Sequence, residues 1–409
     1  MDLELLAALR TPEGIEALAA AAEVAGGDPL AAAMALRGSG VEPALAAAAL
    51  TQAELRRRAA GKFGPGANAM FFTRAGLEQA TRAVVADRRA ARLRAAGVST
   101  LVDLGCGLGA DALAAARQGI SVYAVEADPL TAALAAANAS AAGLTDLVTV
   151  DCADAVSVDV AGFDAVFADP ARRRAGRGRV LDPRSWSPPW DFIASLPARV
   201  PRTVLKLAPG IDHALLPPGA EGEWVSVDGD LVEAAFWCGP LASAARRATL
   251  LSSTSPPPAA QSSSTPKVTT ARAVELTGSG LERAPVGAVG AYLYDPDPAV
   301  VRSHLVAEFA ATVGGRLADP DIAYVYSDLF AKSPFGRVLT VTDVLPFSLK
   351  RLRTLLRERR IGRLEIRKRG SALEPDQLRK DLRLAGPYAA ALVLTKVAGA
   401  PTVIICAPE

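Results

Sequence analysis

The segment 101–111, with the sequence LVDLGCGLGAD, constrains the fold of this chain more than any other stretch. The apolar run before the glycines predicts a buried strand, and the residues after them predict a helix that ends at Gly119. Gly105, Gly107 and Gly109 allow a tight turn and a close approach of the backbone to a ligand, because glycine has no Cβ atom. Such a turn lies at the carboxyl edge of an α/β sheet, where nucleotide cofactors bind.

Two features of this segment favour S-adenosylmethionine over NAD as the cofactor. The glycine spacing is G-x-G-x-G, whereas dinucleotide sites have G-x-G-x-x-G, and Asp103 lies on the strand just before the turn. A carboxylate there repels a pyrophosphate, but it can hold the ammonium group of a methionine moiety directly or through water. A dinucleotide-dependent oxidoreductase is the alternative interpretation of the turn.

Two further predicted strands end in acidic residues that suit the rest of such a cofactor. The strand 121–126 ends in Glu126, whose carboxylate can accept hydrogen bonds from both ribose hydroxyls. The strand 147–150 leads into Asp151 and Asp154, and either carboxylate can accept a hydrogen bond from an adenine amino group. We favour Asp154 for this contact.

The fourth predicted strand, 163–168, is an apolar run that ends at Asp169-Pro170-Ala171-Arg172. The proline makes a rigid turn, so this strand delivers a carboxylate to the same edge of the sheet. With the glycine turn and the two acidic strand ends, this tetrapeptide completes four motifs, in order, by which the chain resembles the class I S-adenosylmethionine-dependent methyltransferases. The resemblance implies that Asp169, Pro170 and Arg172 form the catalytic motif. Ala171 departs from the second proline that is usual in base-directed members.

The resemblance implies an α/β fold with a Rossmann-like sheet of seven strands in the order 3-2-1-4-5-7-6. The last two strands form a hairpin, which is predicted at 223–227 and 231–237 around an Asp-Gly turn. In the family, the segment that leads towards the first strand often covers the methionine end of the cofactor. Phe72 and Thr73 are therefore implied as further cofactor contacts.

Six arginines between residues 172 and 184 follow the catalytic motif, with Trp186 and Trp190 close behind. Guanidinium groups contact phosphates and tryptophan rings stack on bases, so Arg173 and Trp186 are candidate contacts to an RNA substrate. The same composition is also typical of a solvated loop, and both interpretations stay open.

Composition and turn signals divide the chain into several units. Residues 1–95 predict an all-helical domain, with helices that start at prolines 12, 29 and 43. Residues 96–251 hold the methyltransferase motifs, and residues 252–266 are almost entirely Ser, Thr, Pro and Ala, which indicates a linker. Residues 267–409 form the C-terminal region, in which strands and helices alternate from about residue 321.

The region 321–409 resembles the α+β THUMP-like C-terminal domain found behind a group of bacterial methyltransferases. The most recognisable piece is Arg367-Lys368-Arg369-Gly370. THUMP domains are associated with RNA, so the resemblance implies that Arg367, Lys368 and Arg369 dock an RNA substrate. The alternative is a solvated basic face.

The overall charge and the rarer residues exclude some classes of function. A formal charge of +2 provides no global field, so affinity for nucleic acid must come from local patches. Four scattered cysteines without ligand spacing and only two histidines argue against a metal site. His213, after the fifth predicted strand, is interpreted as a helix cap rather than a base. Without an apolar span or a signal peptide, we expect a cytoplasmic protein with no membrane partner.

These features predict an S-adenosylmethionine-dependent methyltransferase that modifies a nitrogen of an RNA base, in tRNA or rRNA. A pyrimidine C5 acceptor would require a cysteine nucleophile at the active edge, and no cysteine lies directly after the Asp169 motif or the fifth predicted strand. The alternatives are a methyltransferase for a small molecule or a protein, and a non-catalytic RNA-binding protein.

Overall fold

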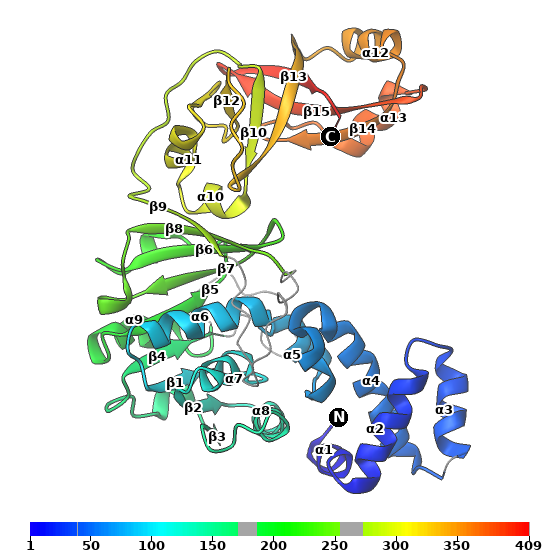
Figure 1. Cartoon of the computed structure of the whole chain (residues 1–409), viewed down its shortest axis with the longest axis vertical. Helices are drawn as coiled ribbons and strands as arrows, with labels where there is room; N and C mark the ends of the chain where they lie inside the picture. Colours follow the sequence, from blue (N-terminus) through cyan, green and yellow to red (C-terminus); the bar gives the residue numbers. More distant parts are fainter. Residues whose placement is uncertain (39, 171–185, 254–272, 409) are drawn as a thin grey trace, which may run out of the picture.

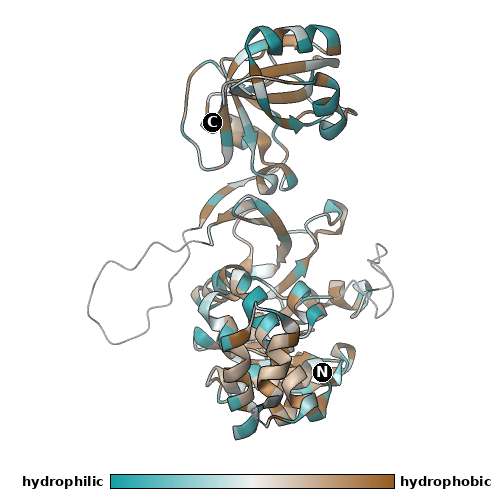
Figure 2. Cartoon of the chain, turned by 90° about the vertical axis from the view of Figure 1, so that its right-hand side faces the viewer, coloured by the Kyte–Doolittle hydropathy of each residue, from teal (hydrophilic) through white to brown (hydrophobic). Residues whose placement is uncertain are grey.

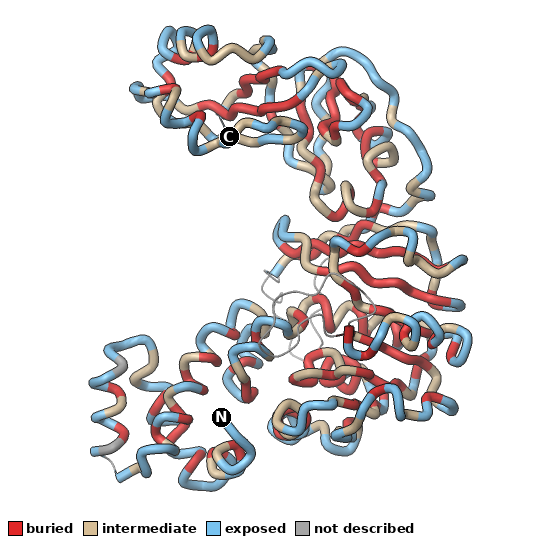
Figure 3. Tube along the Cα trace, turned by 180° about the vertical axis from the view of Figure 1, so that it is seen from behind, coloured by how far each residue is buried: buried red, intermediate tan, exposed pale blue. Residues whose placement is uncertain are grey.

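The computed structural model describes residues 1–38, 40–170, 186–253 and 273–408 of the chain (Figure 1). A helical N-terminal unit, a central α/β unit and a C-terminal α+β unit follow one another along the sequence. In Figure 1 the chain has the outline of a letter C, and Figure 3 shows the same outline from behind, with both terminal units projecting towards the same side of the central unit. No helix in the described ranges is both long and apolar enough to cross a membrane.

The N-terminal unit is built from helices that pack through alanine and leucine side chains. Thr11 Oγ1 accepts a hydrogen bond from Gly14 N at 3.2 Å, and the Glu42 carboxylate accepts one from Leu45 N at 2.9 Å. These caps start the second and fourth helices, so the predicted starts at the prolines are confirmed. The helices up to the first strand are α1 (Leu3–Leu9), α2 (Pro12–Val24), α3 (Pro29–Gly38), α4 (Pro43–Phe63), α5 (Arg74–Gln79) and α6 (Ala83–Ala95).

The central unit contains a sheet whose first seven strands have the predicted order. Within the described residues the full order is β3-β2-β1-β4-β5-β7-β6-β8-β9, and the first five strands in this order are parallel. Its strands are β1 (Thr100–Leu104), β2 (Ser121–Glu126), β3 (Val148–Cys152), β4 (Ala165–Ala168), β5 (Thr203–Leu207), β6 (Glu221–Val227), β7 (Asp230–Trp237), β8 (Arg246–Leu251) and β9 (Val274–Gly278).

The predicted boundary of the central unit at residue 251 is wrong. Strand β9 lies beyond the serine- and proline-rich segment, yet it pairs antiparallel with β8, where Ala248 lies opposite Leu276. The backbone groups at the edge of β8 need hydrogen-bond partners, and β9 supplies them. The central sheet therefore ends at residue 278.

Helices cover both faces of the central sheet. On one face lie α6, α7 (Ala110–Arg117) and α8 (Pro129–Ala141), whose buried side chains join the same core as Leu101 and Phe167. On the other face, α9 (Trp190–Arg199) packs through Ile193 and Leu196. Figure 2 shows that hydrophobic residues follow the strands of both sheets, so each sheet forms the centre of its unit.

The C-terminal unit has a second sheet, with the order β11-β12-β10-β13-β16-β15-β14 in the described residues. Because β10 lies inside this sheet, the unit includes residues from 292 onward, so the sheet extends N-terminal to the THUMP-like segment predicted from about residue 321. Its elements are β10 (Tyr292–Pro296), α10 (Pro298–Arg302), α11 (Val306–Thr312), β11 (Arg316–Leu317), β12 (Val325–Ser327), β13 (Gly336–Pro346), α12 (Leu349–Glu358), β14 (Ile361–Lys368), α13 (Pro375–Leu382), β15 (Tyr388–Val397) and β16 (Ala400–Cys406).

The central and C-terminal units touch at a pair of stacked histidines. The His213 ring lies between Trp224 and His304, with ring centroids 4.5 Å and 3.9 Å apart. Arg302 also donates hydrogen bonds to carbonyl oxygens of the loop that follows β5. The interpretation of His213 as a helix cap is wrong, because the short helical turn there is capped by Asp212.

Burial lowers the pKa of His213 to about 4, and the neighbouring His304, Arg246 and Arg302 add to this effect. Burial lowers the pKa of His304 as well. An unfolded chain would protonate both rings near pH 6.5, so the folded chain binds fewer protons between about pH 6.5 and 4. The stability that the neutral stack contributes is therefore present above pH 6.5 and is lost as the pH falls.

We expect the His213→Phe variant, which keeps a stacking ring but cannot titrate, to lose less thermal stability than the wild type on acidification. Thermal unfolding of both proteins at pH 7.5 and pH 5 measures this difference in Tm. An equal decrease in Tm for the two proteins would show that the histidine stack does not sense pH.

Candidate active site

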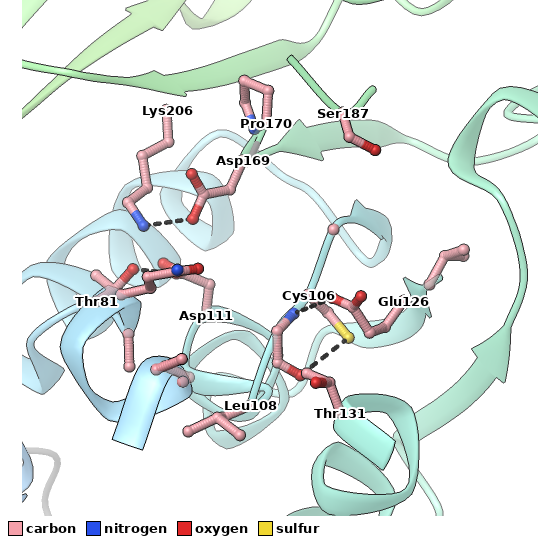
Figure 4. A pocket seen from close by; sticks show the side chains of 18 of the residues that line it. Thr81, Cys106, Leu108, Asp111, Glu126, Thr131, Asp169, Pro170, Ser187 and Lys206 are labelled. Atoms are coloured by element: carbon pink, nitrogen blue, oxygen red, sulfur yellow. Dashed lines mark hydrogen bonds and ion pairs between the residues drawn. The ribbon is translucent and has the colours of Figure 1, made fainter. Parts of the chain in front are cut away.

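A cavity of about 540 Å³ opens where β1, β2, β4 and β5 end. Its wall contains Gly105 and Gly107 from the turn after β1, Glu126 from β2 and Lys206 from β5. Figure 4 shows that Asp169, which follows β4, lies in the same wall with Lys206. The strands thus bring together residues that are separated by up to a hundred positions in the sequence.

The glycine turn adopts the left-handed conformation that its sequence requires. Gly105, Gly107 and Gly109 have φ values of 86°, 55° and 83°, which disfavour any residue with a Cβ atom. A Cβ atom on Gly105 would also lie 3.0 Å from the carbonyl oxygen of Asp169. Gly109 caps α7 and is not part of the wall, so the cavity is lined by the first two glycines.

The two acidic strand ends both reach the cavity. The Glu126 carboxylate accepts hydrogen bonds from Gly107 N at 3.1 Å and from Asp128 N at 3.0 Å. Asp154 also lines the cavity, whereas Asp151 is absent from the wall and accepts a hydrogen bond from Tyr123 Oη at 2.6 Å. This placement supports our choice of Asp154 over Asp151 as the adenine contact.

Asp103 is fully buried and does not line the cavity. Both of its carboxylate oxygens lack a hydrogen-bond partner among the described residues. Burial, together with the nearby carboxylates of Asp111 and Asp169, raises its pKa well above the usual range. Because the side chain does not reach the cavity wall, the predicted contact of Asp103 with the ammonium group would run through a water molecule and not directly.

The residue that sequence reasoning missed beside the catalytic motif is Lys206. Its Nζ lies 2.5 Å from Asp169 Oδ2, and its side chain is only 12 % exposed. Asp169 and Pro170 both line the cavity, as the catalytic prediction requires. Lys206 is the only charged residue within β5, and a lone cation in an otherwise apolar strand was the signal that could have identified it.

A buried set of charges supports the same wall. Arg89 of α6 forms ion pairs with Asp111, in the first turn of α7, and with Glu233 of β7. Thr81 Oγ1 donates a hydrogen bond to Asp111 Oδ2 at 2.6 Å. Asp111 and Glu233 line the cavity, and both carboxylates contribute to raising the pKa of the buried Lys206 despite its desolvation.

Of the two implied contacts before the first strand, one reaches the cavity. Thr73 lines the wall and caps α5, where it accepts a hydrogen bond from Gly76 N at 3.0 Å. Phe72 is fully buried, lies 5.6 Å from the ring of Phe63 and is absent from the wall. The prediction that Phe72 contacts the cofactor is therefore wrong, because its side chain packs into the core.

Of the predicted substrate contacts that follow Asp169, the structure describes the tryptophan but not the arginines. Arg172 and Arg173 lie outside the described residues. Trp186 is 5 % exposed and packs edge-on against Trp190, with ring centroids 6.1 Å apart. The prediction that Trp186 stacks on a base is wrong, because its ring is enclosed by the core.

The three basic residues of the THUMP-like segment are paired within the chain. Arg367 donates a hydrogen bond to Asp295 at 2.6 Å, and Arg369 donates one to the other oxygen of the same carboxylate at 2.9 Å. Lys368 Nζ lies 2.7 Å from Glu374 Oε1. Arg367 also pairs with Glu365, so three carboxylates lie against the three cations. These pairs link β14 to Asp295 of β10 and to Glu374, which precedes α13, so the three cations are already paired within the chain.

The chemistry of the wall fits S-adenosylmethionine better than a dinucleotide. Asp111 occupies the first turn of α7, the helix end at which a pyrophosphate would otherwise bind. Carboxylates outnumber cationic side chains in the wall, which favours a ligand that carries a sulfonium and an ammonium group. Gly105, Gly107, Glu126 and Asp154 are the residues that would hold it. No group of three potential metal-ligating side chains occurs in the part of the chain that the structure describes.

Each of the three structural units contains a segment that matches a protein family. Residues 102–171 match a methyltransferase domain and residues 336–408 match a THUMP domain-like family. Residues 2–59, in the N-terminal helices, match a domain of unknown function.

Comparisons with whole proteins cover most of the chain. Two uncharacterized S-adenosylmethionine-dependent methyltransferases of Mycobacterium tuberculosis, from strains CDC 1551 and H37Rv, are each 33 % identical over 374 residues, which is 87 % of this chain and 95 % of theirs. The crystal structure of a candidate methyltransferase from Porphyromonas gingivalis W83 superposes with a TM-score of 0.70 at 21 % identity. It covers 99 % of this chain and 98 % of that one, so the two share the fold over all three units.

Proposed function

This chain belongs to the S-adenosylmethionine-dependent methyltransferases, and from that premise we propose that it methylates a nitrogen of an RNA base, in tRNA or rRNA. The observation that carries the proposal is the position of Asp169, whose carboxylate lies in the cavity wall beside the glycine turn. The neighbouring THUMP domain-like match supports RNA as the acceptor.

S-adenosylmethionine supplies a methyl group on a positively charged sulfur, so the protein mainly has to align the acceptor and exclude water. Asp169 Oδ2 is bound by Lys206, and no hydrogen bond is made to Oδ1 within the described residues. Oδ1 is therefore available to accept a hydrogen bond from an amino or ring N–H of a base. The same oxygen is placed to take up the proton that the nitrogen loses when it is methylated.

The cysteine nearest to the site favours nitrogen over pyrimidine C5 as the acceptor. Cys106 lines the cavity, and burial together with Asp103 and Glu126 raises the pKa of its thiol well above the usual range. A nucleophilic cysteine has to be a thiolate, so Cys106 does not suit the covalent step of C5 methylation.

A different basic surface of the C-terminal unit supports RNA docking. Residues 349–384 contain thirteen Lys and Arg but only five Asp and Glu, although the whole chain has a charge of only +2. Helices α12 and α13 bury their leucines against the sheet, and the helix at the top of Figure 2 is largely hydrophilic on its outer side. The exposed cations include Lys350, Arg351, Arg357, Arg360, Arg363, Lys380 and Arg383.

We expect the double variant Arg351→Glu/Arg357→Glu to weaken RNA binding at least about tenfold at 0.1 M salt, because α12 would lose its phosphate contacts. The slope of log K against log salt should become shallower by about 1.4 to 1.8. Filter binding over a salt series measures both quantities. The matched control Arg10→Glu/Arg58→Glu makes the same charge change on exposed residues of the N-terminal helices, and equal losses in the two variants would contradict a specific docking surface.

The proposed function is tested by transfer of a labelled methyl group from S-adenosylmethionine to total RNA from a strain that lacks the gene. Label that enters RNA with the wild type and disappears with Asp169→Ala supports the proposal. Digestion to nucleosides and mass spectrometry then identify the methylated atom. Exclusive formation of 5-methylpyrimidines would contradict it, and unlabelled RNA from an enzyme that binds the cofactor would favour a small-molecule or protein acceptor.

A further inference from the structure

We propose that Lys206 is a positioning residue for methyl transfer, which binds one oxygen of Asp169 so that the other oxygen faces the acceptor. This inference rests on the role of Asp169 in the proposed function. Neither the family motifs nor the sequence pattern assigns any role to Lys206.

Strand register makes the contact between these two residues a fixed feature of the fold. Strands β4 and β5 are parallel neighbours in which Ala168 pairs with Leu205, so the next residue of each strand reaches the same edge of the sheet. On its other side, Lys206 pairs with Ala235 of β7, which holds the β5 backbone in the sheet. The lysine side chain therefore has little freedom to leave Asp169.

The charges around Lys206 determine whether its side chain is neutral or protonated, and therefore which of two chemical roles it can have. A neutral lysine could act as a base, whereas a charged lysine can only donate hydrogen bonds. Asp169, Asp111 and Glu233 all surround the ammonium group, and their combined charge outweighs its desolvation and the repulsion from Arg89, so its pKa is raised. Lys206 thus remains a cation over the working pH range of an enzyme and acts by orienting Asp169.

A carboxylate held in one orientation can position the acceptor, because methyl transfer requires the donor sulfur, the methyl carbon and the acceptor nitrogen to lie in line. An unbound aspartate would rotate between several positions, and an error of about 1 Å can reduce the rate about a hundredfold. The lysine binds Oδ2 and leaves Oδ1 free of partners among the described residues, which defines one orientation for the acceptor.

The first test measures turnover and cofactor binding of Lys206 variants. We expect Lys206→Ala to lower kcat about a hundredfold, with KM for the acceptor and the Kd for S-adenosylhomocysteine changed less than about threefold. Because the alanine variant lacks the outer three methylenes and the ammonium, propylammonium chloride should restore part of kcat. It should restore nothing in Asp169→Ala. Lys396→Ala, which removes an exposed lysine of β15, is the control and should match the wild type.

The second test does not depend on which acceptor is used, nor on whether the alanine variant folds. Crystal structures of the wild type and of Lys206→Met, a neutral side chain of similar length, are compared with S-adenosylhomocysteine bound. We expect the Asp169 carboxylate to lose its single orientation in the methionine variant. An unchanged Asp169 in that structure, or an unchanged kcat for Lys206→Ala, would overturn the inference, whereas RNA that stays unlabelled would contradict only the proposed function.

Discussion

Replacing Asp169 with asparagine is expected to lower kcat for methyl transfer about a hundredfold or more. The amide keeps the shape of the side chain but loses the charge that strengthens the hydrogen bond to the acceptor N–H and takes up its proton. It also leaves the ammonium of Lys206 without its nearest counter-ion. Single-turnover transfer of labelled methyl measures the loss.

Cofactor affinity separates this effect from a general disturbance of the site. The residues expected to hold the cofactor are Gly105, Gly107, Glu126 and Asp154, so Asp169→Asn should change the Kd for S-adenosylhomocysteine less than about threefold. Asp159→Asn is the matched control, because the Asp159 side chain is 83 % exposed and pairs only loosely with Arg199 at 4.0 Å. A kcat for Asp169→Asn equal to that of this control would remove Asp169 from the mechanism.

The second large effect concerns stability. Replacing Arg89 with methionine is expected to lower the free energy of unfolding by about 3–5 kcal/mol, because it leaves the carboxylates of Asp111 and Glu233 buried without their shared cation. The guanidinium also lies over the ring of Phe167, at 4.7 Å from its centroid, so a packing contact is lost as well. Urea unfolding followed by the fluorescence of the buried Trp224 and Trp237 reports on the central sheet.

Two further variants show whether the loss comes from the buried charges. Neutralising the partners in the triple variant Arg89→Met/Asp111→Asn/Glu233→Gln should recover much of the stability, since no unpaired charge is then buried. Removing the exposed Arg57, which pairs with Glu54 on the surface of α4, should cost much less, because solvent screens this ion pair. A loss in Arg89→Met no larger than that of Arg57→Met would show that the buried network does not stabilise the fold.

The parts of the site that could be predicted are those encoded within a few neighbouring residues. The glycines after β1 require a left-handed backbone, and the acids at the ends of β2 and β4 follow short apolar runs that are typical of strands. Parallel strands place their carboxyl ends at one edge, so these local signals were sufficient to locate the cavity and to choose its cofactor.

The wrong predictions concern side chains whose neighbours are distant in the sequence. Phe72 and Thr73 are adjacent, yet one enters the core and the other the cavity wall, because Thr73 has extended backbone, in which successive side chains point to opposite sides. The THUMP-like resemblance implied that Arg367 docks RNA, but the sequence near it could not show that the side chain pairs with Asp295, which lies 72 residues away on β10.

By itself the sequence determined the Rossmann-like unit, its cofactor turn and the position of Asp169, since each depends on backbone preferences and short apolar runs. Only the tertiary structure decided that Lys206 binds Asp169, which lies 37 residues earlier, and that Arg89 pairs with Glu233, which lies 144 residues later. The physical reason is that strand register and helix packing determine which charged side chains form ion pairs in and behind the cavity wall. No local sequence pattern predicts these ion pairs, because each charged residue by itself is compatible with exposure to solvent.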